Sequence, residues 1–282
     1  MKLDNYITTE GGYTFYVRDT PGEQGTIVAV HGLTGNHKQF YHFQKSLAGK
    51  YRFISYDIRG RGKSDSASSE TSIFTHAEDL VKLIETLNIK RPILMGYSMG
   101  AYICALVASR LSQIEALILL DGAGEADEIT EQLVLPSLKR LEKIYLSVGA
   151  YVAEIKQLYT SLNINWDDIL EGNVKYEIKP VNGGWKHKSN PRLIKQDFET
   201  FYKFSPEAVC HKISCKTLLL IATGKIAGKA ALFQEAGYEK TKELIPYLTT
   251  EYTDVNHYEL VFNEQPEIVG QITLFLAAKG VK

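Results

Sequence analysis

A serine between two glycines carries the strongest chemical signal of the sequence. Ser98 is the centre of the motif GYSMG, residues 96–100, which follows the apolar segment PILM and precedes an apolar run from Ala101 onward. This context predicts a strand, a sharp turn and a helix, with Ser98 in a strained backbone conformation that pushes its hydroxyl out of the turn. The glycines leave room where the strand and the helix crowd together. The motif therefore predicts a nucleophilic serine.

A nucleophilic serine needs a base for its proton and hydrogen-bond donors for the oxyanion that forms when it attacks a carbonyl. His257 follows the last strand-like segment, LTTEYTDVNH, so it is expected at the same sheet edge as Ser98. His31 opens the segment HGLTG, whose loop is well placed to offer the backbone N–H of Leu33 beside that of Met99. Each such donor can stabilise a transition state by about 2.7 to 4 kcal/mol. We expect the remaining histidines to be surface or packing residues.

A second glycine-rich loop, ISYDIRGRGKSD at residues 54–65, has the sequence Gly-Lys-Ser near its end, as a phosphate-binding loop does. The complete pattern needs a glycine where Asp57 stands, because successive backbone N–H groups must curl around the phosphate. A carboxylate at that position would repel the phosphate, and no helix-period apolar pattern starts directly after Lys63 to supply a helix N-terminus. The loop is therefore not expected to bind a nucleotide.

Composition excludes several classes of partner and site. The 282 residues include 32 basic and 33 acidic side chains, so no charge imbalance favours nucleic acid or an anionic membrane surface. The N-terminal segment lacks the apolar core of a secretory signal, and no apolar run approaches the roughly eighteen residues of a membrane span, so we expect a cytoplasmic protein. The three cysteines are too few and too unevenly spaced for a disulfide framework or a zinc site. No HExxH motif or comparable cluster predicts a metal.

The order of apolar segments predicts the fold class. Six short runs, each ending near a Gly, Asp, Ser or Asn, are expected to be strands, and the central ones are apolar on both faces, as in a buried parallel sheet. They are TIVAVHG, YRFISYD, PILMGYS, EALILLDG, KTLLLIATG and LTTEYTDVNH. Helical stretches lie between several of them, including an apolar stripe from Ala77 to Leu87. This alternation predicts an α/β protein with a mostly parallel, doubly wound sheet, preceded by an N-terminal hairpin.

The alternation is interrupted over residues 124–205, where charged helical segments precede the irregular stretch EIKPVNGGWKHKSNPR. An insertion of this size, rich in aromatic residues, is typical of a lid over the C-terminal edge of the sheet, where ligands bind in such folds. We therefore predict a first core part at 1–123, a mainly helical cap at 124–205 and a second core part at 206–282, which carries His257.

Four motifs in order along the chain, HGLTG, DIRGRGKSD, GYSMG and the late NHY, together resemble the α/β-hydrolase superfamily, and more narrowly its bacterial-type carboxylesterases and related capped hydrolases. The resemblance covers nearly the whole chain and implies an α/β-hydrolase fold with an inserted cap. It also implies that the DIRGRGKSD loop is architectural and braces the oxyanion loop. Asp57, Arg59, Gly60 and Gly62 are therefore expected to be structural rather than catalytic.

The resemblance leaves the acid of the catalytic triad open. Many members of the superfamily carry it a few residues past the strand that corresponds to KTLLLIATG, where Ala227 stands here. Some relatives take it from the end of the preceding strand, which here supplies Asp121, and the order Ser98, Asp121, His257 keeps the nucleophile, acid, base sequence of the fold. We expect Asp121 to be the acid. The rival carboxylates are Glu125, Asp127, Glu235 and Asp254.

The resemblance implies acyl transfer to water. Ser98 is expected to attack an ester carbonyl with His257 as the base, while Asp121 orients His257 and the amides of Leu33 and Met99 hold the oxyanion. No cofactor or metal is needed for this reaction. The expected activity is that of a carboxylesterase for short to medium acyl chains, and the expected partner is a small-molecule ester.

Other functions are compatible with the same residues. Similar triads cleave lactones and carbon–carbon bonds, and fold-level analogy does not decide among them. A lactonase or a carbon–carbon bond hydrolase is the alternative within the enzymes, and a non-catalytic small-molecule binding protein on the same scaffold is the alternative from another class. Tyr97, Trp185 and Tyr258 are candidate substrate-binding residues, because they lie beside the triad in the sequence or in the cap.

Overall fold

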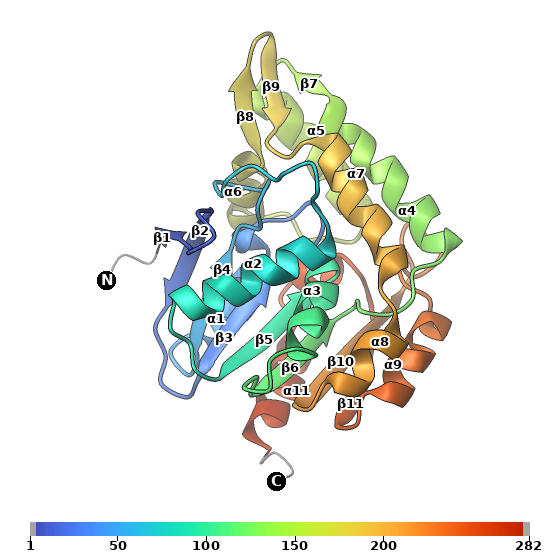
Figure 1. Ribbon diagram of the computed structural model, residues 1–282. Coiled ribbons are helices and arrows are strands. Elements are labelled where there is room, and N and C mark those ends of the chain that lie inside the picture. The colour runs from blue at the N-terminus through green and yellow to red at the C-terminus, as the bar shows by residue number, and fades with distance from the viewer. Residues whose placement is uncertain (1–3, 279–282) are drawn as a thin grey trace.

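A computed structural model describes residues 4–278, whose central feature is an eight-stranded sheet in the order β1-β2-β4-β3-β5-β6-β10-β11 (Figure 1). All strands from β4 to β11 along this order pair in parallel, and the N-terminal hairpin β1-β2 adds to β4 in the antiparallel sense. The predicted mostly parallel sheet and the hairpin are confirmed. The strands are β1 (Asp4–Thr8), β2 (Thr14–Thr20), β3 (Thr26–Val30), β4 (Arg52–Tyr56), β5 (Pro92–Tyr97), β6 (Ala116–Leu120), β10 (Lys216–Gly224) and β11 (Leu248–Asn256).

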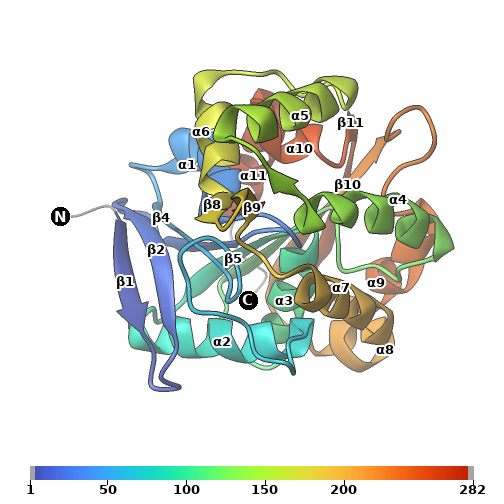
Figure 2. The same ribbon diagram turned by 90° about the horizontal axis from the view of Figure 1, so that it is seen from above.

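Helices cover both faces of the sheet, which is why its central strands are apolar throughout. Every residue of β5 and β6 is buried. Helices α2 (Ile73–Thr86) and α3 (Met99–Ala108) lie on one face, and α1 (Tyr41–Leu47) and α11 (Pro266–Ala277) lie on the other (Figure 2). The fully buried α3 has no polar face because it packs on β3, β5 and β6 and against α2. This is the doubly wound α/β architecture that the order of apolar segments predicts.

Residues 124–205, which make up most of the segment between β6 and β10, lie above the C-terminal edge of the strands (Figure 1). We call these residues the cap. Its helices are α4 (Glu128–Leu138), η2 (Lys139–Glu142), α5 (Val148–Ser161), α6 (Asp168–Tyr176), α7 (Pro191–Glu199) and η3 (Thr200–Lys203). The core resumes with α8 (Pro206–Val209) and η4 (Cys210–Lys212), and η5 (Glu235–Tyr238) and α9 (Glu239–Leu244) follow β10.

The cap also contains a small antiparallel sheet in the stretch that the sequence led us to expect as irregular. Its strands are β7 (Ile144–Tyr145), β8 (Ile178–Val181) and β9 (Gly184–His187), in the order β7-β9-β8. Gly183 and Gly184 adopt φ angles of 85° and 146°, which allows the tight β8-β9 turn. The strands are too short, and too interrupted by glycine and proline, to show the alternation that identifies a strand in a sequence.

Buried polar contacts fasten the cap to the core. The Arg61 guanidinium, from the core, lies 2.7 Å from the Asp197 carboxylate of α7, and both side chains are buried. The Tyr176 hydroxyl of α6 donates a hydrogen bond to the Asp57 carboxylate. Removing one partner of a buried ion pair typically costs about 3 to 5 kcal/mol, so these contacts hold the cap in one position. Among residues 4–278, no helix has the length and apolar character needed to cross a bilayer.

Candidate active site

The turn between β5 and α3 holds Ser98 in a conformation that few residues adopt. Its backbone angles are φ 55° and ψ −119°, and 6% of its surface is exposed. A Cβ on Gly96 would lie 2.2 Å from the carbonyl oxygen of Gly100, and a Cβ on Gly100 would lie 1.9 Å from the carbonyl oxygen of Val30. Both obstacles are backbone atoms, so only glycine fits at these positions. The motif GYSMG thus has the strand-turn-helix geometry of a nucleophile elbow.

The parallel register brings the candidate residues to one edge of the sheet. Tyr97 of β5 pairs with Leu120 of β6, and the next residue of each strand is Ser98 and Asp121, respectively. The backbone N–H of Ser98 donates to the Leu120 carbonyl at 3.0 Å. His257 follows the last residue of β11. Strand ends that are far apart in the sequence therefore meet, as expected for parallel strands.

Asp121 is the carboxylate that contacts His257. Its Oδ2 lies 2.6 Å from Nδ1 of His257, and both side chains are buried. Its Oδ1 accepts hydrogen bonds from the backbone N–H of Ala222 at 3.1 Å and from the Tyr238 hydroxyl at 3.0 Å. These donors fix the carboxylate so that its other oxygen faces the imidazole. The roles of Ala222 and Tyr238 could not be predicted from local sequence patterns, because both residues reach Asp121 only through the fold.

The rival carboxylates have other contacts. Glu125 accepts a hydrogen bond from Lys240, and Asp127 caps α4 by accepting from the backbone N–H of Thr130. Glu235 accepts from the Tyr252 hydroxyl, and Asp254 is exposed on β11. None of the four lies within 4.0 Å of the imidazole nitrogens of His257. The position after β10, where many relatives carry the acid, is occupied by Ala227.

Tyr97 lies under His257. Its ring stacks on the imidazole with a centroid separation of 4.7 Å, and its hydroxyl donates to the His257 carbonyl at 2.9 Å. Only 2% of its surface is exposed. Tyr97 therefore positions the histidine. It does not line the space above Ser98, so its position differs from that of the substrate-binding residue that we expected.

The loop after β3, residues 31–36, is the candidate oxyanion loop. A Cβ on Gly32 would lie 3.3 Å from the Cβ of Ser98, so the loop packs directly on the elbow. Nε and Nη2 of Arg61 both donate to the Leu33 carbonyl at 3.1 Å, and the backbone N–H of Gly32 donates to Gln39 at 2.9 Å. Within residues 4–278, the N–H groups of Leu33 and Met99 have no hydrogen-bond acceptor. Both are thus free to donate to an oxyanion.

His31 fixes the start of this loop. Its Nδ1 lies 2.7 Å from the Gly32 carbonyl, and its Nε2 accepts from the backbone N–H of Ile58 at 3.0 Å. One nitrogen must therefore donate and the other accept, which is the pattern of a neutral imidazole. Burial lowers the pKa of His31 to about 3, so the ring stays neutral at ordinary pH. His31 supports the oxyanion loop and is not placed to act as a base.

The DIRGRGKSD loop has the bracing contacts that the resemblance implies. The Asp57 carboxylate accepts from the backbone N–H groups of His37 at 2.9 Å and Lys63 at 2.8 Å. A Cβ on Gly62 would lie 1.9 Å from this carboxylate, and Gly62 has a φ of 53°. The loop thus folds around a buried anion of its own, which leaves no cradle for phosphate.

Two aromatic candidates lie on the cap side or beside the triad. Trp185 is half-buried on β9, where it pairs with Tyr145 of β7. The Tyr258 ring meets the His257 imidazole edge to face, with a centroid separation of 5.4 Å. The half-buried positions leave part of each ring available for contact with a ligand.

Arg140 is a cap residue that the sequence did not single out. It lies in η2, which packs against β9 and α7. Its Nη2 donates to the Thr34 hydroxyl at 3.2 Å, directly after Leu33 in the oxyanion loop. A single arginine in a charged helical segment gives no local signal, because its importance depends on the residues that it meets across the fold.

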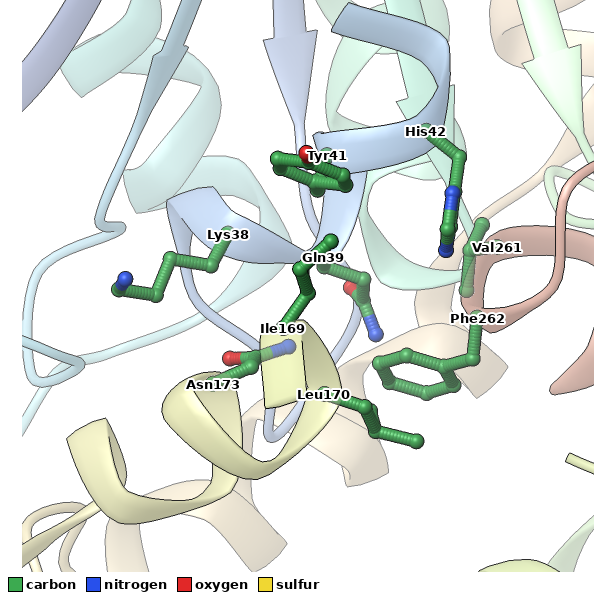
Figure 3. A pocket seen from close by; sticks show the side chains of 9 residues that line it. All are labelled: Lys38, Gln39, Tyr41, His42, Ile169, Leu170, Asn173, Val261 and Phe262. Atoms are coloured by element: carbon green, nitrogen blue, oxygen red, sulfur yellow. The ribbon is translucent and has the colours of Figure 1, made fainter. Parts of the chain in front are cut away.

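A small hollow lies at another part of the boundary between cap and core (Figure 3). Figure 3 shows α6 of the cap facing η1 (His37–Phe40) and α1, with α10 (Glu259–Phe262) beside them. Its lining residues are Lys38, Gln39, Tyr41, His42, Ile169, Leu170, Asn173, Val261 and Phe262. None of them belongs to the triad, so this hollow is separate from the candidate catalytic centre.

Comparison with curated proteins identifies a family. Residues 25–258 match the model of the alpha/beta hydrolase fold. The chain is 35% identical over 127 residues to the AB hydrolase superfamily protein YisY of Bacillus subtilis, which covers 44% of this chain and 47% of that protein. It is 31% identical over 209 residues to a 3-hydroxybutyrate-oligomer hydrolase of Cupriavidus necator, covering 67% of this chain and 65% of that protein. The chain thus spans about half of the first relative and somewhat more of the second.

Solved structures share the architecture. The structure is similar to that of an E-2-(acetamidomethylene)succinate hydrolase, with a TM-score of 0.84 and 22% identity over 98% of this chain and 99% of that chain. It is also similar to a thioesterase domain from the curacin biosynthetic pathway, with a TM-score of 0.73 and 17% identity over 98% of both chains. At these identities the likeness concerns the fold alone.

Proposed function

Since the chain belongs to the α/β-hydrolase family, we propose that it is a serine hydrolase that cleaves carboxylic esters through an acyl-enzyme on Ser98. One observation carries the proposal. The strained serine of the elbow lies at the same sheet edge as a buried histidine whose Nδ1 is 2.6 Å from the Asp121 carboxylate. A serine, a histidine and an orienting acid are the parts that activate a hydroxyl for attack on a carbonyl.

The proposed reaction follows from these contacts. The Asp121 carboxylate accepts a hydrogen bond from the Nδ1–H of His257, which leaves the unprotonated Nε2 as the base that takes the proton of the Ser98 hydroxyl. The serine oxygen bonds to the ester carbonyl carbon, and the N–H groups of Leu33 and Met99 donate to the resulting oxyanion. His257 then gives its proton to the leaving alcohol. Water repeats the cycle on the acyl-enzyme and releases the acid.

An ester is our first choice of substrate because it needs nothing beyond these parts. A 3-hydroxybutyrate-oligomer hydrolase is among the relatives, which supports hydrolysis as the reaction type. Lactone and carbon–carbon bond hydrolysis remain the alternatives among enzymes, and a small-molecule binding role remains the alternative outside them. We favour an enzyme because a binding protein has no need for a strained serine beside two free amide donors.

We also propose that the reaction takes place in the cytoplasm. Cys104, Cys210 and Cys215 are free thiols in buried positions, which suits a reducing compartment. Burial raises the pKa of Cys210 and of Cys215 to about 11, so both thiols stay protonated and unreactive at neutral pH.

Steady-state hydrolysis of 4-nitrophenyl esters of increasing acyl length tests the proposal. We expect turnover by the unmodified protein and its loss in Ser98→Ala, since the nucleophile is absent. Ser109→Ala is the matched control, because Ser109 ends the same helix α3 in an ordinary helical conformation and should leave turnover unchanged. Circular dichroism of each variant checks folding.

A fluorophosphonate probe gives an independent test, because it modifies activated serines whatever the substrate. We expect it to label Ser98 and not Ser109. A folded protein that neither hydrolyses the ester series nor reacts with the probe would contradict the serine-hydrolase proposal and favour the binding role. Labelling of Ser98 without ester turnover would favour a lactone or a carbon–carbon bond substrate.

A further inference from the structure

The Arg140 guanidinium lies in the cap and has fewer hydrogen-bond acceptors around it than it has N–H donors. Its Nη1 donates to the Ser137 carbonyl at 2.9 Å, and its Nη2 donates to the Thr34 hydroxyl at 3.2 Å. Its Nε is buried and has no hydrogen-bond partner within residues 4–278. A guanidinium carries five N–H donors in a rigid fork, so several of them are left to receive an acceptor.

No carboxylate of the described chain pairs with Arg140. Among residues 4–278, none lies within 4.0 Å of its nitrogens, although each of the two fully buried arginines, Arg59 and Arg61, has such a partner. Arg140 itself is half-buried, and its Nε atom is fully enclosed. The nearby Glu177 is occupied by the Tyr151 hydroxyl, which donates to it at 2.5 Å. Burial raises the pKa of Glu177 and the charge of Arg140 opposes that rise, so Glu177 is a weak counterion. A partly buried charge without a counterion is unfavourable, and a bound anion would remove that cost.

Arg140 lies beside the catalytic residues. Thr34, which it contacts, directly follows Leu33, one of the two candidate oxyanion donors. The positive charge of Arg140 also opposes the rise that burial causes in the pKa of Tyr258, the residue after His257. The guanidinium is therefore close to both sides of the site, the oxyanion loop and the histidine. Its position in η2 next to β9 places it in the cap, above the edge where an ester would bind.

We propose that Arg140 binds a carboxylate of the substrate, so that the ester cleaved at Ser98 carries a free acid group at a distance from the scissile bond. This inference rests on the proposed function. A carboxylate fits the planar fork of the guanidinium through two parallel hydrogen bonds. One guanidinium balances one carboxylate, whereas a phosphate dianion would keep an unbalanced charge in a partly buried site.

Pairs of substrates that differ only in the remote charge test the carboxylate site. The acidic members are 4-nitrophenyl monoesters of glutaric, adipic and suberic acid, and the neutral members are their methyl-capped counterparts. We expect kcat/KM to favour at least one acidic member over its neutral counterpart by about 10- to 100-fold, the range for hydrogen bonds to a charged group. In Arg140→Met this ratio should fall to about one, mainly through KM.

The matched control is Lys139→Met, which removes a positive charge from the neighbouring residue of η2. Lys139 is exposed, so the variant should keep the preference of the unmodified protein. Arg140→Lys keeps the charge without the fork and should retain only part of the preference. It also replaces Arg140→Met if that variant does not fold.

Calorimetry gives a readout that does not need turnover. Adipate should bind the Ser98→Ala protein with one site, and the additional change Arg140→Met should abolish binding. Inorganic phosphate should bind more weakly than adipate. Binding of phosphate without adipate would overturn the assignment to a carboxylate.

The two proposals fail in different ways. If Ser98 is labelled by the fluorophosphonate and the neutral esters are cleaved as well as the acidic ones, or if Arg140→Met keeps the preference, only the carboxylate site is overturned. If no ester is cleaved and Ser98 stays unlabelled, the proposed function fails. In that case adipate binding decides about Arg140, because its loss in Arg140→Met supports the site and its absence in the unmodified protein overturns it.

Discussion

The C-terminal edge of the sheet and the cap above it differ in how many of their titratable side chains have hydrogen-bond partners. At the edge, the Asp121 carboxylate has three hydrogen-bond partners, and both nitrogens of His31 are in use. In the cap, Nε of Arg140 and Nε2 of His187 are buried without a hydrogen-bond partner among residues 4–278. The acid and the bracing histidine of the edge thus have fixed partners, whereas the cap has side-chain donors without an acceptor.

Under the proposed function, this difference separates the groups that carry the reaction from those that recognise the substrate. A triad works only if its acid and base are held in one geometry before the substrate arrives, so the groups that orient them need fixed partners. A binding surface needs the opposite, since a donor that is already satisfied contributes nothing to a ligand. The core can therefore keep one reaction while the cap decides which molecule undergoes it.

The largest expected effect comes from Asp121→Asn at the sheet edge. The amide would donate to Nδ1 of His257 and leave the proton on Nε2, which could then no longer accept the proton of Ser98. We expect kcat for the ester series to fall by about 10³- to 10⁴-fold. The fold should persist, because asparagine tolerates the positive φ of 46° at this position.

Asp127→Asn is the matched change in the cap. Asp127 caps α4 with its side chain, and asparagine caps helices about as well, so activity and stability should remain close to those of the unmodified protein. Full activity of Asp121→Asn together with a loss in Asp127→Asn, Glu125→Gln, Glu235→Gln or Asp254→Asn would assign the acid to that rival instead.

A pair of glycine substitutions compares the two regions through their backbones. Gly100→Ala would place a Cβ 1.9 Å from the Val30 carbonyl oxygen, where neither backbone can move aside, so we expect a loss of about 3 kcal/mol in the free energy of unfolding. Gly172→Ala in α6 of the cap meets nothing within 4 Å and should stabilise the protein by about 0.5 to 1 kcal/mol. Urea unfolding measures both.

Equal effects of the two glycine substitutions would contradict this comparison. A stable Gly100→Ala protein, in particular, would mean that the elbow can relax and that the strain at Ser98 is not enforced by its surroundings. Activity measured on the same samples adds a second readout. A folded Gly100→Ala protein should still lose turnover, because the shift needed to fit the methyl group displaces the Met99 amide.

The comparison also explains which features could be predicted from the sequence. The elbow is a contiguous motif, and parallel strands must end at one edge, so Ser98, Asp121 and His257 could be placed together from local patterns. The preference for Asp121 over its rivals came from the resemblance to the superfamily, and the contact at 2.6 Å from His257 supports it. The partners of Asp121 and the position of Arg140 depend on residues that are distant in the sequence. No local sequence pattern predicts contacts between residues that are so far apart in the chain.

The smallest expected effect concerns His31 and the pH dependence of stability. Its pKa is about 3 in the folded protein and 6.5 in a model compound, so below pH 6.5 the unfolded chain binds this proton more readily than the folded one. The contribution to stability is complete above pH 6.5 and is lost as the pH falls toward 3. The slope from this group is at most about 1.4 kcal/mol for each pH unit.

His31→Gln removes the titrating group, so the free energy of unfolding should depend less steeply on pH than in the unmodified protein. Urea unfolding between pH 6.5 and 4.5 measures the slope while most carboxyl groups remain ionised. His211→Gln, a change at an exposed histidine, should keep the original slope. An unchanged slope in His31→Gln would mean that His31 is already protonated in the folded protein. The hydrogen bond that Nε2 accepts from Ile58 would then be lost, and with it one brace of the oxyanion loop.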